Sequence, residues 1–105
     1  MTRILFVDDE ARILTGLSRM LRGLRNEWEM VFVEGGHQAI ECCESATFDV
    51  VVSDARMPGM DGSELLQRTR ELHPDTARII LSGQCGRESV IACVAVAHQF
   101  LNKPC

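Results

Sequence analysis

The sequence lacks the features that would direct it to a membrane, a secretory route or nucleic acid. Its apolar runs all fall well short of the roughly 20 residues that span a bilayer, and Arg3 with Asp8-Asp9 interrupts the apolar start that a signal peptide needs. The net charge is −4 and no Lys/Arg cluster rises above a solvated helix face, so direct nucleic-acid binding is not expected. These absences predict a cytoplasmic protein with no membrane segment.

The cysteines also lack the spacing of a metal or disulfide framework. No C-x-x-C pair occurs, and no histidine stands at a matching distance. We therefore interpret all five as reduced structural thiols: Cys42, Cys43, Cys85, Cys93 and Cys105.

What is present is the composition of one folded domain. The chain has 105 residues, of which 46% are hydrophobic and 25% charged, which suits a globular protein with a single core. No repeat, linker or low-complexity segment divides it, so residues 1–105 are treated as one domain.

Strand-like and helix-like segments alternate along the chain. Apolar runs predict buried strands over 3–7, 28–33, 50–53, 77–81 and 98–102. Apolar residues at intervals of three and four, with Ile13 and Leu72 among those expected to face the core, predict helices over 10–24, near 39–46, over 63–72 and over 87–97. This series predicts an α/β fold, a doubly wound five-stranded parallel sheet that is flavodoxin-like with strand order 2-1-3-4-5.

The helix that should follow the fifth strand is missing, since the sequence stops at Lys103-Pro104-Cys105. Several hundred Å² of apolar surface would then stay wet, which at about 25 cal/mol per Å² is comparable with the whole stability of a small domain. We expect the isolated chain to be unstable, and the natural polypeptide to continue beyond Cys105 with an amphipathic helix, a linker and an output domain. A homodimer that covers the face is the alternative.

Polar residues follow four of the predicted strands: Asp8 and Asp9, Asp54, Ser82, and Lys103. The carboxyl ends of parallel strands meet at one edge, where α/β proteins bind ligands. Three carboxylates there repel one another unless a hard cation neutralises them, and Mg²⁺ suits such a site. A lysine and a hydroxyl complete an oxyanion-binding arrangement. Each residue alone is typical of a cap, a turn or a solvated charge, but the combination favours a site.

These residues lie in motifs that resemble the response-regulator receiver domain of two-component signalling systems. The resemblance covers essentially the whole chain and rests on Ile4-Leu-Phe-Val-Asp-Asp-Glu10, Ser53-Asp-Ala-Arg-Met-Pro-Gly-Met-Asp-Gly62, Leu81-Ser-Gly83 and Phe100-Leu-Asn-Lys-Pro104. It implies that Asp54 accepts a phosphoryl group from a sensor histidine kinase or phosphotransfer protein, or more slowly from small acyl-phosphate donors. The domain would thus catalyse its own phosphorylation and dephosphorylation, while acting mainly as a signalling switch.

The resemblance also implies a role for each residue around Asp54. Asp9, Asp54 and the backbone carbonyl of Arg56 would bind Mg²⁺ directly, and Asp8 would act through metal-bound water. Ser82, the Gly83 N–H and Lys103 would bind the phosphoryl group. Phe100 stands at the switch-aromatic position, where the alternative is a plain core residue on the last strand.

Two further positions concern tuning and output. Arg56 and Gln84 occupy positions that in this family influence how fast water attacks the acyl phosphate, unless they are simply solvated loop residues. The helix predicted over 87–97 is rich in small apolar residues and is expected to present an interaction surface that responds to phosphorylation. The segments 81–84 and 97–105 are similar to those of receivers fused to HDOD or HD-type output domains.

Two alternatives stay open from the sequence. A haloacid-dehalogenase-like phosphatase also combines an aspartyl nucleophile, Mg²⁺ and a lysine, but it needs Asp-x-Asp after the first strand, which Asp8-Asp9-Glu10 does not supply. A pseudo-receiver that only mediates interactions is disfavoured because all five site positions are filled.

Overall fold

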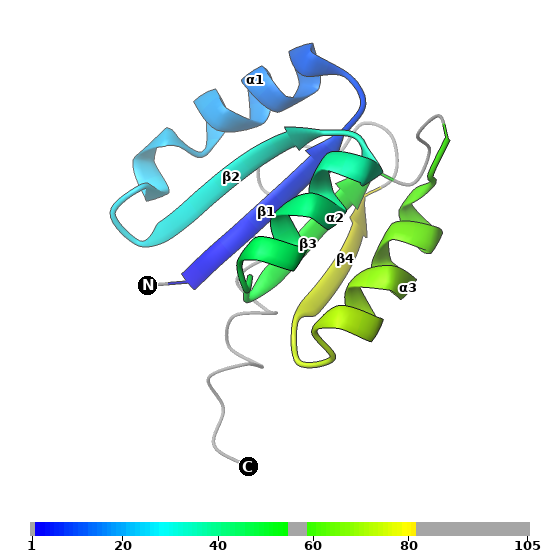
Figure 1. Cartoon of the computed structure of the whole chain (residues 1–105). Coiled ribbons are helices and arrows are strands. Elements are labelled where there is room, and N and C mark those ends of the chain that lie inside the picture. Colours follow the sequence, from blue (N-terminus) through cyan, green and yellow to red (C-terminus); the bar gives the residue numbers. More distant parts are fainter. Residues whose placement is uncertain (1, 55–58, 82–105) are drawn as a thin grey trace.

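The computed structural model describes residues 2–54 and 59–81. Within them, strands alternate with helices along the chain (Figure 1). The strands are β1 (Thr2–Asp8), β2 (Trp28–Glu34), β3 (Val50–Asp54) and β4 (Ala77–Leu81). The helices are α1 (Ala11–Met20), the short 3₁₀ helix η1 (Arg22–Leu24), α2 (Gly36–Ser45) and α3 (Gly62–Leu72).

The four strands form one parallel sheet in the order β2-β1-β3-β4. This arrangement confirms the predicted flavodoxin-like topology for these strands. The centre of β1 is apolar without alternation because both of its faces are buried: Ile4, Leu5 and Phe6 are fully buried and Val7 is nearly so. The predicted fifth strand over 98–102 and the helix over 87–97 lie outside the described residues.

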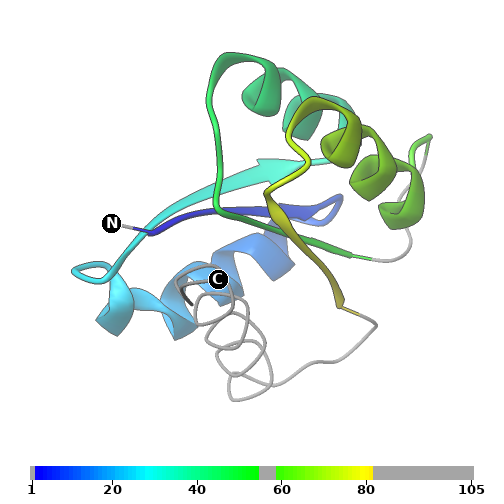
Figure 2. The same ribbon diagram turned by 90° about the horizontal axis from the view of Figure 1, so that it is seen from below.

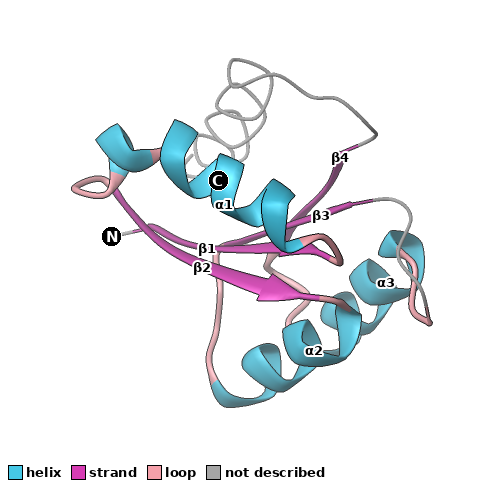
Figure 3. Ribbon diagram, turned by 90° about the horizontal axis from the view of Figure 1, so that it is seen from above, coloured by secondary structure: helices cyan, strands magenta, loops and turns pink. Residues whose placement is uncertain are grey.

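Helices cover both faces of the sheet. In two opposite views α1 lies on one face, and α2 and α3 lie on the other (Figures 2 and 3). On the α1 face Ile4, Phe6 and Val52 of the sheet pack with Leu14 and Trp28. On the other face the alternate residues of the same strands, Leu5, Val7 and Val51, share a core that includes Ala39, Cys43 and Leu65 of the helices. No helix among residues 2–54 and 59–81 has the length and apolar character needed to cross a membrane.

Three helix predictions need correction. The helix predicted over 10–24 ends at Met20 and gives way to η1. Ile13 is 46% exposed, because Leu14, Leu17 and Leu21 already provide the stripe that meets the sheet. Leu72 is 42% exposed; the next residue, His73, contacts α2 instead, through a 2.7 Å hydrogen bond between its Nε2 and the carbonyl oxygen of Cys43.

Helix α2 begins at Gly36, earlier than its apolar stripe near 39–46 predicts. The reason lies in the residue before it. Gly35 has a φ of +91°, a conformation that residues with a β-carbon rarely adopt. This glycine turns the chain sharply from β2 into α2, so that only one residue separates the strand from the helix.

Candidate functional site

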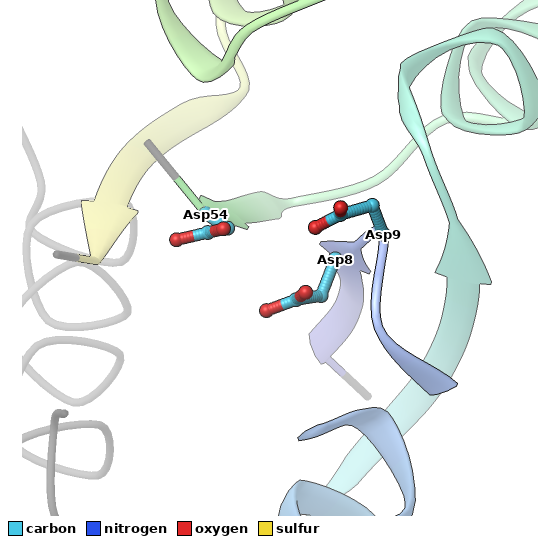
Figure 4. A group of neighbouring side chains, drawn as sticks. All are labelled: Asp8, Asp9 and Asp54. Carbon is cyan, nitrogen blue, oxygen red and sulfur yellow. The ribbon is translucent and has the colours of Figure 1, made fainter. Parts of the chain in front are cut away.

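Three aspartates gather where β1 and β3 end (Figure 4). The register pairs Val7 with Ser53. The next residue of each strand, Asp8 and Asp54, therefore lies at the same place, the carboxyl ends of the strands. Asp9 follows directly after β1. One carboxylate oxygen from each aspartate lies within 4.8 Å of those of the other two. The structure therefore brings together the three carboxylates of the predicted site.

Asp8 is the most buried of the three, with 8% of its surface exposed. The pKa of its carboxyl is raised to about 6: burial is the largest cause, the backbone N–H of Glu10 opposes the rise, and the nearby charges of Asp54 and Asp9 add to it. That N–H donates to Asp8 Oδ1 at 2.9 Å. The site thus holds more negative charge than it can solvate, and a proton or a cation relieves it.

Asp54 is the last residue of β3 and is partly exposed. Its backbone pairs with Leu81 of β4, and the hydroxyl of the buried Ser53 donates to the Asp54 carbonyl at 2.9 Å. A carboxylate on such a fixed backbone, at the end of a buried strand, can meet a ligand without leaving the sheet.

Sequence reasoning missed the buried residue and the cap that precede α3. Met60 is buried, with 2% exposed, and belongs to the core that includes Leu65 of α3. Asp61 caps α3 by accepting the Glu64 N–H at 2.8 Å. The sequence did contain a signal for this helix start. An apolar residue precedes the capping Asp and another stands at the fourth helical position, which is a hydrophobic staple, and the Glu at the third helical position supplies half of a capping box.

The remaining predicted site residues lie outside the described residues. They are Arg56 of the loop after β3, the phosphoryl-binding residues Ser82, Gly83 and Lys103, the tuning residue Gln84 and the switch residue Phe100. The described part of the site is therefore its acidic half. Of the predicted thiols, Cys42 and Cys43 are free, and the other three cysteines also lie outside.

The acidic half has the chemistry of a site for a hard divalent cation. Carboxylate oxygens are the ligands that Mg²⁺ prefers, and it commonly takes few of them and keeps several waters. Asp8 already accepts the Glu10 N–H with one oxygen, whereas within residues 2–54 and 59–81 no backbone N–H donates to the carboxylate of Asp9 or Asp54.

Comparison with known proteins points in one direction. The sequence profile of the response regulator receiver domain matches residues 4–105. The chain is 37% identical over 103 residues to the hydrogenase transcriptional regulatory protein HoxA of Bradyrhizobium diazoefficiens, covering 96% of this chain and 21% of that protein. It is 34% identical over 99 residues to the DNA-binding transcriptional regulator NtrC of Escherichia coli, with coverages of 93% and 21%.

Solved structures agree with this likeness. The response regulator receiver protein of Sinorhizobium medicae superposes with a TM-score of 0.79 at 26% identity, covering 97% of this chain and 95% of that one. By contrast, the chain spans about a fifth of the length of the curated relatives named above.

Proposed function

The chain belongs to the response regulator receiver family of two-component signalling, and we propose that Asp54 is its phosphoryl-accepting residue. The observation that supports this most is the position of Asp54 at the end of β3, within 4.8 Å of oxygens from Asp8 and Asp9. A carboxylate there lies beside the charge that a metal would neutralise, and its backbone is fixed by the sheet.

Mg²⁺ fits this donor set, and we propose Asp9, Asp54 and the backbone carbonyl of Arg56 as its direct partners. The Asp8 carboxylate is more deeply buried and already accepts the Glu10 N–H, which suits an indirect role through water. When bound, the cation supplies positive charge that offsets the negative charge of the phosphoryl oxygens and of the three carboxylates. The raised pKa of Asp8 is the expected sign of a site prepared for such charge.

In the proposed reaction a carboxylate oxygen of Asp54 attacks the phosphorus of a phosphohistidine. The new O–P bond forms as the P–N bond breaks, and the electron pair of the broken bond stays on the imidazole nitrogen of the donor. Lys103, Ser82 and the Gly83 N–H bind the transferred group's oxygens, because transfer of this kind relies on positioning and charge stabilisation. Arg56 and Gln84 then control the approach of water to the acyl phosphate.

The signal is proposed to leave the domain through a switch. Bonds from Ser82 to the new phosphate would draw it towards Asp54 and let Phe100 change position, which reshapes the surface of residues 87–97. Only such differential contacts can shift a conformational equilibrium. The donor is proposed to be a cytoplasmic histidine kinase or phosphotransfer protein, and the recipient an output domain C-terminal to residue 105, of HDOD or HD type.

Acetyl phosphate with Mg²⁺ tests the assignment of Asp54. Intact-mass spectrometry of the 105-residue chain should show one added phosphoryl group, which Asp54→Asn abolishes. The matched control Asp75→Asn should keep it, because Asp75 lies just before the amino end of β4, opposite to the carboxyl ends of the strands where Asp54 lies. Undiminished phosphorylation of the Asp54 variant would disprove the assignment. A wild-type chain that gains no mass with any donor would instead be a pseudo-receiver.

Calorimetry tests the proposed ligand roles. Asp9→Asn should weaken Mg²⁺ binding more than Asp8→Asn, since loss of a direct ligand removes a bond as well as a charge whereas a water-mediated partner is partly replaced. Equal weakening would contradict the distinction. Amide exchange over residues 87–100 with and without fluoroberyllate tests the switch, and identical exchange in the two samples would refute it.

A further inference from the structure

The segment of α1 and η1 concentrates positive charge on an otherwise acidic chain. Residues 11–25 contain four arginines and not one aspartate or glutamate, although the whole chain carries a net charge of −4. The four are Arg12, Arg19, Arg22 and Arg25. Such a concentration attracts an anionic partner only if the arginines are unpaired and share an accessible surface, and within residues 2–54 and 59–81 three of the four meet both conditions.

Three of these arginines line a groove between the outer flank of α1 and β2. The groove consists of two adjoining cavities of about 610 Å³ and 510 Å³ that share Ser18 and Phe32. Arg19 and Arg22 line the first cavity and Arg25 lines the second. Figure 3 shows α1 lying on the face of the sheet beside β2, and residues of both elements line these cavities. Arg12 lines neither cavity.

The groove arginines have no partner within residues 2–54 and 59–81. The ion pairs in that part of the chain are Arg3 with Glu29 at 2.7 Å and Arg68 with Glu64 at 3.8 Å. Glu29 lines the second cavity, but its charge is already paired with Arg3, so it does not neutralise Arg25. As far as the described part of the chain goes, the groove therefore combines unpaired guanidinium groups at the η1 end with one unpaired carboxylate, Glu34, at the other end.

The strand beside the groove has an open side. In the described sheet β2 is an outermost strand and pairs only with β1. Its outer edge therefore offers backbone N–H and C=O groups, except at its last residue, where the Glu34 N–H donates to Gln38 Oε1 at 3.2 Å. An extended peptide can add to such an edge as another strand. Side chains of an added strand alternate between the two faces of the sheet. Every second one would reach the α1 face, where Arg19, Arg22 and Arg25 lie.

We propose that the α1–β2 groove binds an extended acidic segment of a partner protein. The segment adds to the edge of β2 and directs carboxylates at alternate positions to Arg19, Arg22 and Arg25. Guanidinium groups bind carboxylates in a planar, two-bond geometry, and the strand edge matches a peptide backbone, which a nucleic acid does not possess. This binding is independent of phosphorylation at Asp54.

Fluorescence polarisation with synthetic peptides tests the proposal. The probe is a labelled ten-residue peptide in which glutamate and threonine alternate, and it is compared with a peptide of the same composition whose glutamates are contiguous and with a ten-residue oligothymidylate. At 0.15 M salt we expect the 105-residue chain to bind the alternating peptide at least about fivefold more tightly than the other two. Arg22→Glu and Arg25→Glu should each lower that affinity about tenfold or more, which is of the size of one charge-assisted pair.

Arg12→Glu is the matched control, since it makes the same charge change in the same basic segment 11–25, on α1, but outside the groove. It should change the affinity less than twofold, and Asp54→Asn should leave it unchanged. Amide NMR shifts on adding the alternating peptide should concentrate in residues 28–34. Equal losses from Arg12→Glu and Arg22→Glu, equal binding of the three probes, no binding at millimolar peptide or shifts elsewhere would each overturn the proposal. If a glutamate variant fails to fold, Arg22→Gln and Arg12→Gln replace the pair.

Discussion

Gly36 at the start of α2 lies directly against the side chain of Met60. A β-carbon at position 36 would come within 2.7 Å of Met60 Sδ and 3.0 Å of its Cβ and Cγ. The contact joins Met60, two residues before α3, to the first residue of α2. Because Met60 is also buried in the core that includes Leu65 of α3, its side chain is held between the two helices.

Gly36→Ala should therefore destabilise the protein. We expect the free energy of unfolding to fall by about 1–3 kcal/mol, as for overpacking of a tight core, measured by urea denaturation. Gly16→Ala is the control, since it lies inside α1 with nothing within 4 Å of a built β-carbon; it should be neutral or stabilise by up to about 1 kcal/mol. Equal effects of the two substitutions would show that the Met60 contact is not tight.

Thr76→Val should cost about 1–2 kcal/mol of stability. The buried Thr76 hydroxyl donates to the Phe48 carbonyl at 2.6 Å, and valine keeps the shape but leaves that carbonyl without this donor. The effect should appear as a lower midpoint in urea with an unchanged slope. Thr47→Val, at an exposed position just before Phe48, should change the midpoint very little; a similar loss from both would contradict the role of this bond.

Asp54→Asn should stabilise the metal-free protein at neutral pH. Removing one of three charges whose oxygens lie within 4.8 Å of one another relieves repulsion, by about 1 kcal/mol for a site open to solvent. The gain should shrink in 1 M salt. In excess Mg²⁺ the order should reverse, because the wild type gains binding free energy that the variant lacks. A variant no more stable than wild type in EDTA would refute this electrostatic account.

The raised pKa of Asp8, at about 6 against an ordinary 3.8, predicts a pH dependence. The folded state holds this proton more tightly than the unfolded state, so the contribution of Asp8 to stability is present below about pH 4 and is lost as the pH rises through 6. Without metal, the stability difference between wild type and Asp8→Asn should change by about 2 kcal/mol across that window, towards a less stable wild type. Thermal melts in EDTA would measure it.

Mg²⁺ competes with the same proton, so its affinity should rise from pH 5 to pH 7 in the wild type. Asp8→Asn should flatten that rise. A wild-type affinity that does not vary with pH would mean that Asp8 remains ionised in the folded protein.

The strands and the acidic edge were predictable from sequence because each depends on a short local pattern. An apolar run that stops at Asp8 or Asp54 can be buried only up to that residue, and parallel pairing then places such residues at one edge. Ile13 and Leu72 were harder, since an apolar helical stripe is wider than the surface that the sheet offers. The Gly36–Met60 contact joins residues distant in sequence, and nothing near Gly36 indicates which side chain will lie above it.

The groove arginines show a different limit. Their charge is visible in the sequence, but an arginine on a helix is usually solvated, and only the fold shows that Arg19, Arg22 and Arg25 share cavities with β2. The pairing of Arg3 with Glu29 across neighbouring strands likewise follows from the β1–β2 register, which pairs these two residues.

The β1–β3 pairing divides the acidic site between two halves of the chain. Asp8 and Asp9 belong to the half that contains β1, α1, β2 and α2, while Asp54 belongs to the half that begins with β3. A protein cut between α2 and β3 would therefore yield two fragments, neither of which holds all three carboxylates. Recovery of full metal affinity on mixing them would directly report that β3 had docked beside β1 in its native register.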